Sequence, residues 1–127
     1  MSRISGSNTK PEIIVRKMIH GMGFRYRLNV RELPGTPDIV LPKHKKVVFV
    51  HGCFWHGHKG CKRSERPSSN ISFWNRKIEQ TMARDKKAIK DLKKLGWQPL
   101  IIWECKTRNP ITLKKILTKF LDSEVHS

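Results

Sequence analysis

The chain has 127 residues, a mass of 14.9 kDa, 37% hydrophobic residues and a formal net charge of +17. This length suits a single compact domain over residues 1–127, with about residues 1–9 as a short N-terminal arm. The excess of Lys and Arg indicates a polyanionic partner. Because no basic amphipathic helix or lipidation motif is evident, the charge favours nucleic acid over an anionic membrane.

The sequence shows no signal for a membrane or for secretion. No apolar run approaches the roughly 18 residues of a membrane span, and the opening MSRISGSNTK is too polar for a signal peptide. We therefore expect a cytoplasmic protein. Its three cysteines, Cys53, Cys61 and Cys105, are an odd number in a reducing compartment, which favours metal binding or free thiols over disulfides.

The first half of the chain predicts one helix followed by strands. Thr9 and Glu12 have the spacing of a capping box, which indicates a helix over residues 10–21. Apolar and polar residues then alternate over residues 24–30, the pattern of a half-buried strand. The short runs DIVL and VVFV, joined by PKHKK, predict a hairpin within a sheet, with residues 42–46 as its turn.

The second half predicts two helices on either side of a buried strand. After the polar loop KRSERPSSN, a helix should span about residues 73–95 and end at Gly96. The run PLIIW is a strand reached by a crossover onto a central sheet, and Asn109-Pro110 opens a last amphipathic helix. This order predicts an α/β fold in which helices flank a mixed sheet. The buried stripes should comprise Ile78, Met82, Ile89, Leu92 and Leu95 in the long helix, and Leu113, Ile116, Leu117, Phe120 and Leu121 in the last one.

The segment HGCFWHGHKGC, residues 51–61, concentrates metal-binding and aromatic side chains. Cys53, His58 and Cys61 have the spacing C-x4-H-x2-C, and Cys105 follows a strand that sheet topology could return to the same place. Three thiols and one imidazole suffice for a closed tetrahedral Zn²⁺ site that joins the hairpin to the last strand. The alternative is a set of buried thiols beside a solvated histidine.

The remaining histidines and one aspartate indicate a hydrolytic site. A metal-anchored loop would hold the imidazole of His56 rigidly enough for a general base, although a second metal ligand or a surface histidine is the alternative. Asp38 begins one hairpin strand and His51 ends the next, so both should lie at one edge of the sheet. Asp38 and the backbone carbonyl of Val50 could hold Mg²⁺ beside a scissile phosphate. The alternative for Asp38 is a turn residue after Pro37.

Adjacent aromatic residues occur at two places. Phe54 and Trp55 stand in the glycine-rich and histidine-rich segment, and the pair FW at residues 73–74 opens the long helix. Loop aromatics in a strongly basic chain fit a hydrophobic core poorly, so insertion between DNA base steps is the functional interpretation. Packing in the core is the alternative. Trp97 and Trp103 flank a strand, and we expect both in the core.

Taken in order, the motifs NTKPE, LPGTPDIV, VFVHGCFWHGHKGC, FWNRKI, RD and LGWQPLIIWEC resemble the very-short-patch-repair (Vsr) DNA mismatch endonucleases. The similarity extends from about Met1 to about Arg108, and HGCFWH and WEC are its rarest motifs. The resemblance implies a restriction-endonuclease-like fold and a strand-specific, Mg²⁺-dependent nick in duplex DNA, 5' to the thymine of a T:G mismatch. It also implies a bacterial, nucleoid-associated enzyme that works with mismatch-repair proteins. We expect a monomer, because a nick in one strand needs no second active site.

The resemblance assigns a role to each candidate residue by position. Asp38 looks like the Mg²⁺-binding carboxylate, with the backbone carbonyl of Val50 as a second ligand. His56 resembles the general base, His51 the residue beside the scissile phosphate, and Glu12 an acid that supports the active site. The zinc ligands correspond to Cys53, His58, Cys61 and Cys105. The DNA-binding residues correspond to the aromatic wedge of Phe54, Trp55 and Trp74, together with Lys77.

The chain departs from related patterns at two points. The usual restriction-fold signature has an acidic residue and a lysine on its second strand, where this chain has FVH, so that Asp38 is the only strand carboxylate. The zinc loop has one residue more between His58 and Cys61 than the tightest Vsr sequences. Two other functions stay open: a catalytically silent, zinc-containing DNA-binding module, and an endonuclease of the same fold without mismatch specificity. The joint presence of Asp38, His51 and His56 favours an enzyme, since a binding module does not need them.

Overall fold

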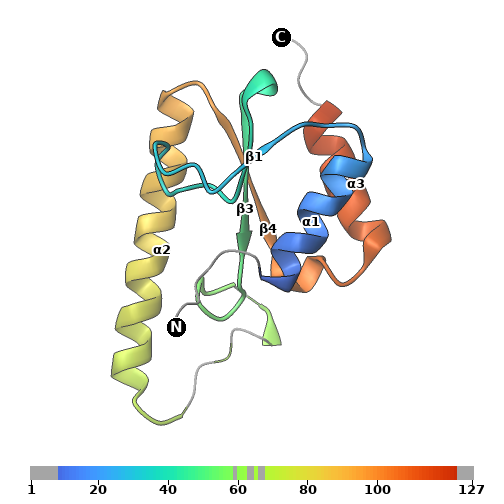
Figure 1. The fold of residues 1–127 in the computed structure, drawn as a ribbon. Coiled ribbons are helices and arrows are strands. Elements are labelled where there is room, and N and C mark those ends of the chain that lie inside the picture. The colour runs from blue at the N-terminus through green and yellow to red at the C-terminus, as the bar shows by residue number, and fades with distance from the viewer. Residues whose placement is uncertain (1–8, 59, 63–64, 66–67, 123–127) are drawn as a thin grey trace.

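A four-stranded sheet organises the chain in the computed structural model, which describes residues 9–58, 60–62, 65 and 68–122 (Figure 1). The elements in chain order are α1 (Lys10–Gly21), β1 (Arg27–Leu28), β2 (Ile39–Leu41), η2 (Pro42–His44), β3 (Lys46–His51), α2 (Ile71–Lys94), β4 (Gln98–Trp103), η4 (Glu104–Lys106) and α3 (Pro110–Asp122). The strand order is β1-β2-β3-β4, in which β1-β2 and β2-β3 are antiparallel and β3-β4 is parallel.

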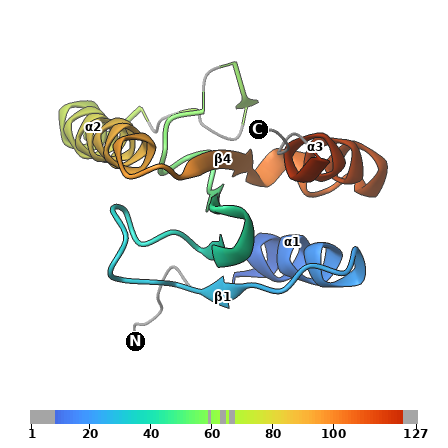
Figure 2. The ribbon, with the colours of Figure 1, turned by 90° about the horizontal axis from the view of Figure 1, so that it is seen from above.

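Helices cover both faces of this sheet, with α2 on one side and α1 and α3 on the other (Figures 1 and 2). Side chains along β2 and β3 alternate between the two faces. Ile39 and Val48 join the core cluster formed with α1 and α3, whereas Val40 and Phe49 pack in the cluster that includes Leu92 of α2. Because both faces are buried, these strands are continuous apolar runs rather than alternating ones.

Most of the predicted elements are confirmed. The helix predicted over residues 10–21 is α1, in which the Thr9 hydroxyl accepts the Glu12 N–H at 3.4 Å. The hairpin turn falls at η2, and α2 is the crossover between the parallel strands β3 and β4. The α/β class with a mixed sheet is therefore correct. Among the described residues, no helix combines the length and apolar character that crossing a membrane requires.

The length of the first strand and the burial of Leu95 differ from the prediction. The strand expected over residues 24–30 shrinks to the two residues of β1, because the backbone leaves the extended region at Asn29, whose φ is +47°. Leu28 is consequently 40% exposed. Leu95, expected to be buried, is 57% exposed. Helix α2 ends there, and Trp97 instead packs against the core cluster on that side of the sheet.

A buried charge links the hairpin to the last helix. Lys46, expected in the hairpin turn, begins β3 and has no exposed surface. Its ammonium group donates hydrogen bonds to the carbonyls of Phe120 and Leu121, in the last turn of α3. A cation there complements the partial negative charge of the helix C-terminus, so this contact holds β3 against α3.

The loop before Asp38 passes very close to α2. Gly35 has φ +77°, and a Cβ atom added to it would lie 2.7 Å from Ala88 Cβ and 3.2 Å from the Phe49 ring. Only glycine satisfies both the positive φ and this separation. The close approach therefore positions the segment that delivers Asp38 to the sheet edge.

Replacing Gly35 with Ala should lower the free energy of unfolding by about 3 kcal/mol, because strain at positive φ adds to overpacking against α2. Gly23→Ala is the matched control, since Gly23 has φ +92° and no atom within 4 Å of an added Cβ. It should lose only about 1 kcal/mol. Urea denaturation measures both losses, and equal losses would contradict the close approach.

Candidate active site and metal centre

The acidic part of the site lies at one end of the β2-β3 hairpin. Asp38 directly precedes β2, and the pairing of Ile39 with Val48 brings it beside Val50. The Val50 N–H donates to Asp38 Oδ2 at 2.7 Å. Because the N–H and C=O of a strand residue point to the same side, the Val50 carbonyl also faces the Asp38 side.

Two acidic side chains interact here. The pKa of Asp38 is raised to about 6, chiefly by burial and to a smaller extent by the charge of Glu12, against the lowering effects of the Val50 hydrogen bond and of His56. Glu12 comes from α1, is 1% exposed, and lies 3.5 Å from the Arg16 guanidinium. Neighbouring carboxylates in a buried site ionise together only if a cation compensates them. An oxygen-preferring divalent cation such as Mg²⁺ fits this set of donors.

A histidine pair faces an aspartate of α2. His56 Nδ1 donates to Asp85 Oδ2 at 2.6 Å, which leaves His56 Nε2 available for proton transfer. The His51 ring stacks on the His56 ring at a centroid distance of 3.7 Å. Burial, followed by the neighbouring His56, lowers the pKa of His51 to about 4, and its buried Nδ1 has no hydrogen-bond partner among the described residues. His51 is therefore neutral at physiological pH.

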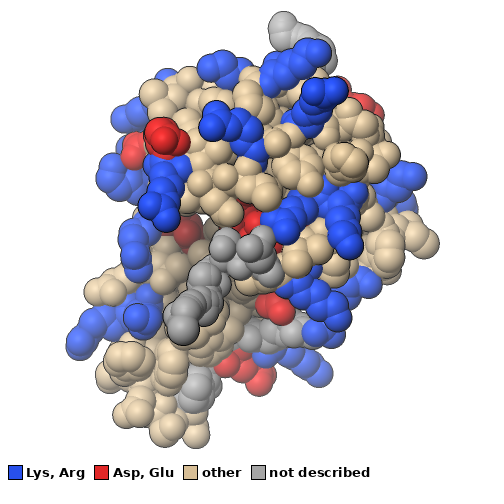
Figure 3. Space-filling model, viewed as in Figure 1, with Lys and Arg blue, Asp and Glu red and all other residues tan. Residues whose placement is uncertain are grey.

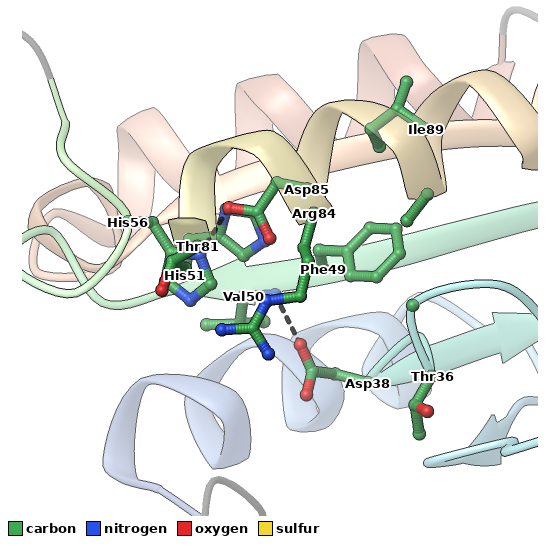
Figure 4. Close-up of a pocket in the computed structure, with 12 residues that line it drawn as sticks. Thr36, Asp38, Phe49, Val50, His51, His56, Thr81, Arg84, Asp85 and Ile89 are labelled. Atoms are coloured by element: carbon green, nitrogen blue, oxygen red, sulfur yellow. Dashed lines mark hydrogen bonds and ion pairs between the residues drawn. The ribbon is translucent and has the colours of Figure 1, made fainter. Parts of the chain in front are cut away.

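These groups line one cavity of about 440 Å³ between the hairpin and α2 (Figure 4). Asp38 lies on the hairpin side of the cavity, while Arg84 and Asp85 project from α2. His51 and His56 close one end. The arrangement combines a candidate cation site with a proton acceptor that is oriented by a carboxylate. Both groups can promote the hydrolysis of a phosphodiester.

Asp85 is the site residue to which the sequence interpretation assigned no role, although it belongs to the motif RD. It lies on α2 between Met82 and Ile89, both of which belong to the apolar stripe expected for that helix. A carboxylate at a position with the spacing of a buried stripe is the signal that could have identified it. The other neighbours of the site, Asp38, His51 and His56, are residues that the sequence singled out.

The second cluster consists of Cys53, His58, Cys61 and Cys105, whose ligand atoms all lie within 4.8 Å of one another. The register that pairs His51 with Trp103 explains why two of them meet, because Cys53 and Cys105 each follow that pair by two residues. Cys105 Sγ lies 3.6 Å from His58 Nδ1. The structure thus brings the four expected residues together.

The donors of this cluster suit a zinc ion. Burial and the neighbouring thiols raise the pKa of Cys53 to about 12, so the thiols need a cation to ionise. Burial, with a smaller effect of Lys106, lowers the pKa of His58 and keeps its imidazole in the neutral, ligating form. Three sulfur atoms and one nitrogen match a closed tetrahedral Zn²⁺ site.

The aromatic residues form one cluster between the metal loop and the start of α2. The Phe54 ring lies 5.1 Å from Trp55 and 5.3 Å from Trp74, and Phe73 extends the cluster at 5.0 Å from Trp74. Trp55 is 48% exposed and Phe73 is 55% exposed, so this cluster is not part of the core. Lys77 is exposed one turn further along α2.

The core placement expected for Trp103 is wrong. Its ring stacks on His58 at 4.2 Å and meets the edge of His51 at 5.3 Å. Trp103 lies at the end of β4, where both histidine-containing clusters converge. It therefore separates the thiol cluster from the histidine pair, and its position depends on the pairing of β4 with β3 rather than on a local pattern.

The fold and the two clusters define the class as a DNA endonuclease of the restriction-endonuclease-like fold, and the sequence comparisons agree. A family model described as "DNA mismatch endonuclease Vsr" matches residues 1–63. The "Type II nicking enzyme V.XorIIP" of Xanthomonas oryzae is 43% identical over 122 residues, which cover 96% of this chain and 89% of that protein. The "Type II nicking enzyme V.NmeAIP" of Neisseria meningitidis is 43% identical over 121 residues, which cover 95% of this chain and 86% of that protein.

The "DNA mismatch endonuclease Vsr" of Escherichia coli is 38% identical over 108 residues, covering 85% of this chain and 69% of that enzyme. The chain belongs to the Vsr family of DNA mismatch endonucleases. It is a nicking endonuclease that acts on DNA. The resemblance on which the sequence interpretation relied is therefore confirmed.

Cys105→Ser should release zinc and lower the melting temperature by roughly 10 °C, because metal binding contributes to folding free energy. Elemental analysis should find about one Zn²⁺ per wild-type chain and none in the variant. A chelator should lower the melting temperature of the wild type to that of Cys105→Ser and leave the variant unchanged. Zinc-free wild-type protein with the same melting temperature would refute the metal centre.

Asp38→Asn should stabilise the protein at pH 7.5 in buffer without Mg²⁺, by as much as about 3 kcal/mol. The folded pKa of about 6 exceeds the ordinary value of 3.8, so ionising Asp38 costs stability as the pH rises between these values. Asn keeps an acceptor for the Val50 N–H. Urea denaturation should show the advantage of Asn vanishing near pH 4, whereas a constant difference would disprove a raised pKa.

Proposed function

We propose that the enzyme nicks one strand of duplex DNA 5' to the thymine of a T:G mismatch, in a Mg²⁺-dependent reaction that initiates very short patch repair. The observation that carries this proposal is the cavity where Asp38, His56 and Asp85 converge. The name of the E. coli relative supports a mismatch as the target. We also propose that residues 1–127 act as a single domain and as a monomer.

His56 acts as the general base in this proposal. Its Nε2 takes a proton from water while its Nδ1–H stays bonded to Asp85, which would stabilise the imidazolium that forms. The water oxygen forms a bond to phosphorus, and the bond from phosphorus to the 3' oxygen breaks. The leaving 3' oxygen takes a proton from solvent, and the 5'-phosphate remains on the thymidine.

Asp38 and the Val50 carbonyl would hold Mg²⁺, which when bound stabilises negative charge on the phosphate oxygens. Their hydrogen-bonded geometry places both oxygens on one side of β3. Glu12 supports this site electrostatically, because its charge acts on Asp38. His51 is stacked on His56 and holds that ring in place, and it lies beside the phosphate as a neutral hydrogen-bond donor.

The thiol cluster serves the reaction indirectly. His56 lies between Cys53 and His58, so a Zn²⁺ ion held by Cys53, His58, Cys61 and Cys105 would restrain the backbone on both sides of the general base. A general base must stay within hydrogen-bond reach of the attacking water. We therefore propose that the zinc is structural.

The aromatic cluster would supply mismatch preference. Phe54, Trp55 and Trp74 insert between base steps next to the mismatch, where unstacking costs less than in paired duplex. Lys77 contacts the backbone on the same side. Lysine and arginine side chains spread over much of the face shown in Figure 3, which suits attraction of DNA.

The test is a denaturing gel of an end-labelled duplex with one T:G mismatch, incubated with the protein with and without Mg²⁺, beside the matched duplex. A Mg²⁺-dependent nick 5' to the thymine, absent from the matched duplex, is expected. Cleavage of both duplexes at the same rate would indicate an endonuclease without mismatch specificity. A band shift without cleavage would indicate a silent DNA-binding module.

Two variants separate the proposed roles in the same assay. Asp38→Ala should abolish nicking and keep the band shift. Trp55→Ala should reduce the ratio of mismatched to matched cleavage roughly tenfold, the cost of one stacking contact. Ile111→Ala, which truncates an apolar residue that is 70% exposed on α3, is the control and should leave the ratio unchanged.

A further inference from the structure

Arg84 is a cation that belongs to the motif RD, but it received no role from the sequence and the proposed mechanism does not use it. It precedes Asp85 on α2 and lines the cavity together with Asp38 and the histidine pair. Figure 4 shows its side chain reaching from the helix, with the guanidinium directed into the cavity on the Asp38 side. Within the described part of the chain, no carboxylate lies within ion-pair distance of this guanidinium, so its donors are available to a ligand.

The charges around the cavity define what that ligand must be. Asp38 and Asp85 line it, and Glu12 acts on Asp38 from behind, so a phosphodiester entering the cavity meets acidic groups. Arg84 is the only lysine or arginine among the described lining residues. A phosphate that approaches Asp38 therefore needs Arg84 as a protein-borne positive charge, in addition to any metal ion.

The strand sequence points to the same residue. Strand β3 brings no lysine or arginine to the cavity, because its residues that line the cavity are Phe49, Val50 and His51. The positive charge missing from the strand is present on the facing helix, across the same cavity. A guanidinium suits this place because its planar donors can bond two phosphate oxygens at once.

We propose that Arg84 is a catalytic residue whose guanidinium binds two non-bridging oxygens of the scissile phosphate. This inference rests on the proposed nuclease function and extends it. The contact strengthens as negative charge gathers on these oxygens while water attacks and the bond to the 3' oxygen breaks. Removing one such donor from a hydrolytic site typically slows the chemical step by about 10²-fold to 10³-fold.

The kinetic test compares single-turnover nicking, at saturating enzyme and Mg²⁺, on the duplex that the wild type cuts best. Arg84→Ala should slow nicking at least about 100-fold, and Arg84→Lys about tenfold, because an ammonium keeps the charge without the fork. Lys86→Ala is the matched control: it removes one charge from an exposed residue about 200° around α2. Equal rates for Arg84→Ala and Lys86→Ala would overturn the proposal.

A binding test addresses the contact without cleavage. The duplex carries either the natural scissile phosphate or an uncharged methylphosphonate at that position, and Kd is measured with Ca²⁺ in place of Mg²⁺. The measured quantity is the ratio of Kd for the neutral duplex to Kd for the charged duplex. This ratio should be several-fold larger for the wild type and for Lys86→Ala than for Arg84→Ala. An identical ratio for all three proteins would show that Arg84 does not contact this phosphate.

The two tests separate this inference from the nuclease proposal. If replacing Arg84 lowers the ratio of the two Kd values but the wild type nicks no duplex, Arg84 binds the phosphate and the nuclease proposal fails. If the wild type nicks and both Arg84 tests match the Lys86 control, the nuclease proposal stands and Arg84 is only a surface charge.

Discussion

Hydrogen bonding between the parallel strands β3 and β4 sets the geometry on which both sites depend. The ladder pairs His51 with Trp103, and the chain continues two residues further on each strand to Cys53 and Cys105. A parallel pair also requires a long crossover, here α2, which carries Asp85 over the strand ends to His56. The same ladder therefore aligns the thiol cluster, the histidine pair and the helix that completes the cavity.

The surface and the cavity have opposite electrostatic character. The chain carries a net charge of +17, and its lysines and arginines spread over much of the visible surface (Figure 3), whereas carboxylates converge inside. A general basic field brings DNA to the protein without choosing a bond. The buried carboxylates of the cavity lower the stability of the fold when they ionise, so a cation bound beside them is stabilising. The positive charges on the surface thus attract DNA, whereas the charged groups of the cavity select a single phosphate.

Local patterns were sufficient for most elements and insufficient where packing overrides them. The capping box of α1 and the apolar stripe of α3 follow from neighbours three and four residues apart, and both are confirmed. The long first strand predicted from the alternation is wrong, because the extent of a strand depends on its pairing. Strand β1 pairs with β2 only through Arg27 and Leu28. Lys46 was expected in a turn, since no local signal reveals that it meets the end of a helix more than seventy residues away.

The sequence by itself determined the residue types of the chemistry: three cysteines and a histidine for a metal, an aspartate after a turn, and two further histidines beside them. It also determined the Vsr family, because the motifs are long and rare. Only the tertiary structure decided which groups touch. Both Asp85 and Arg84 belong to α2. By its spacing Asp85 falls on the apolar stripe of this helix, and Arg84 falls on its surface. They line the cavity because the crossover places α2 against the hairpin. Contacts between segments distant in sequence depend on strand register and helix packing, which no local spacing specifies.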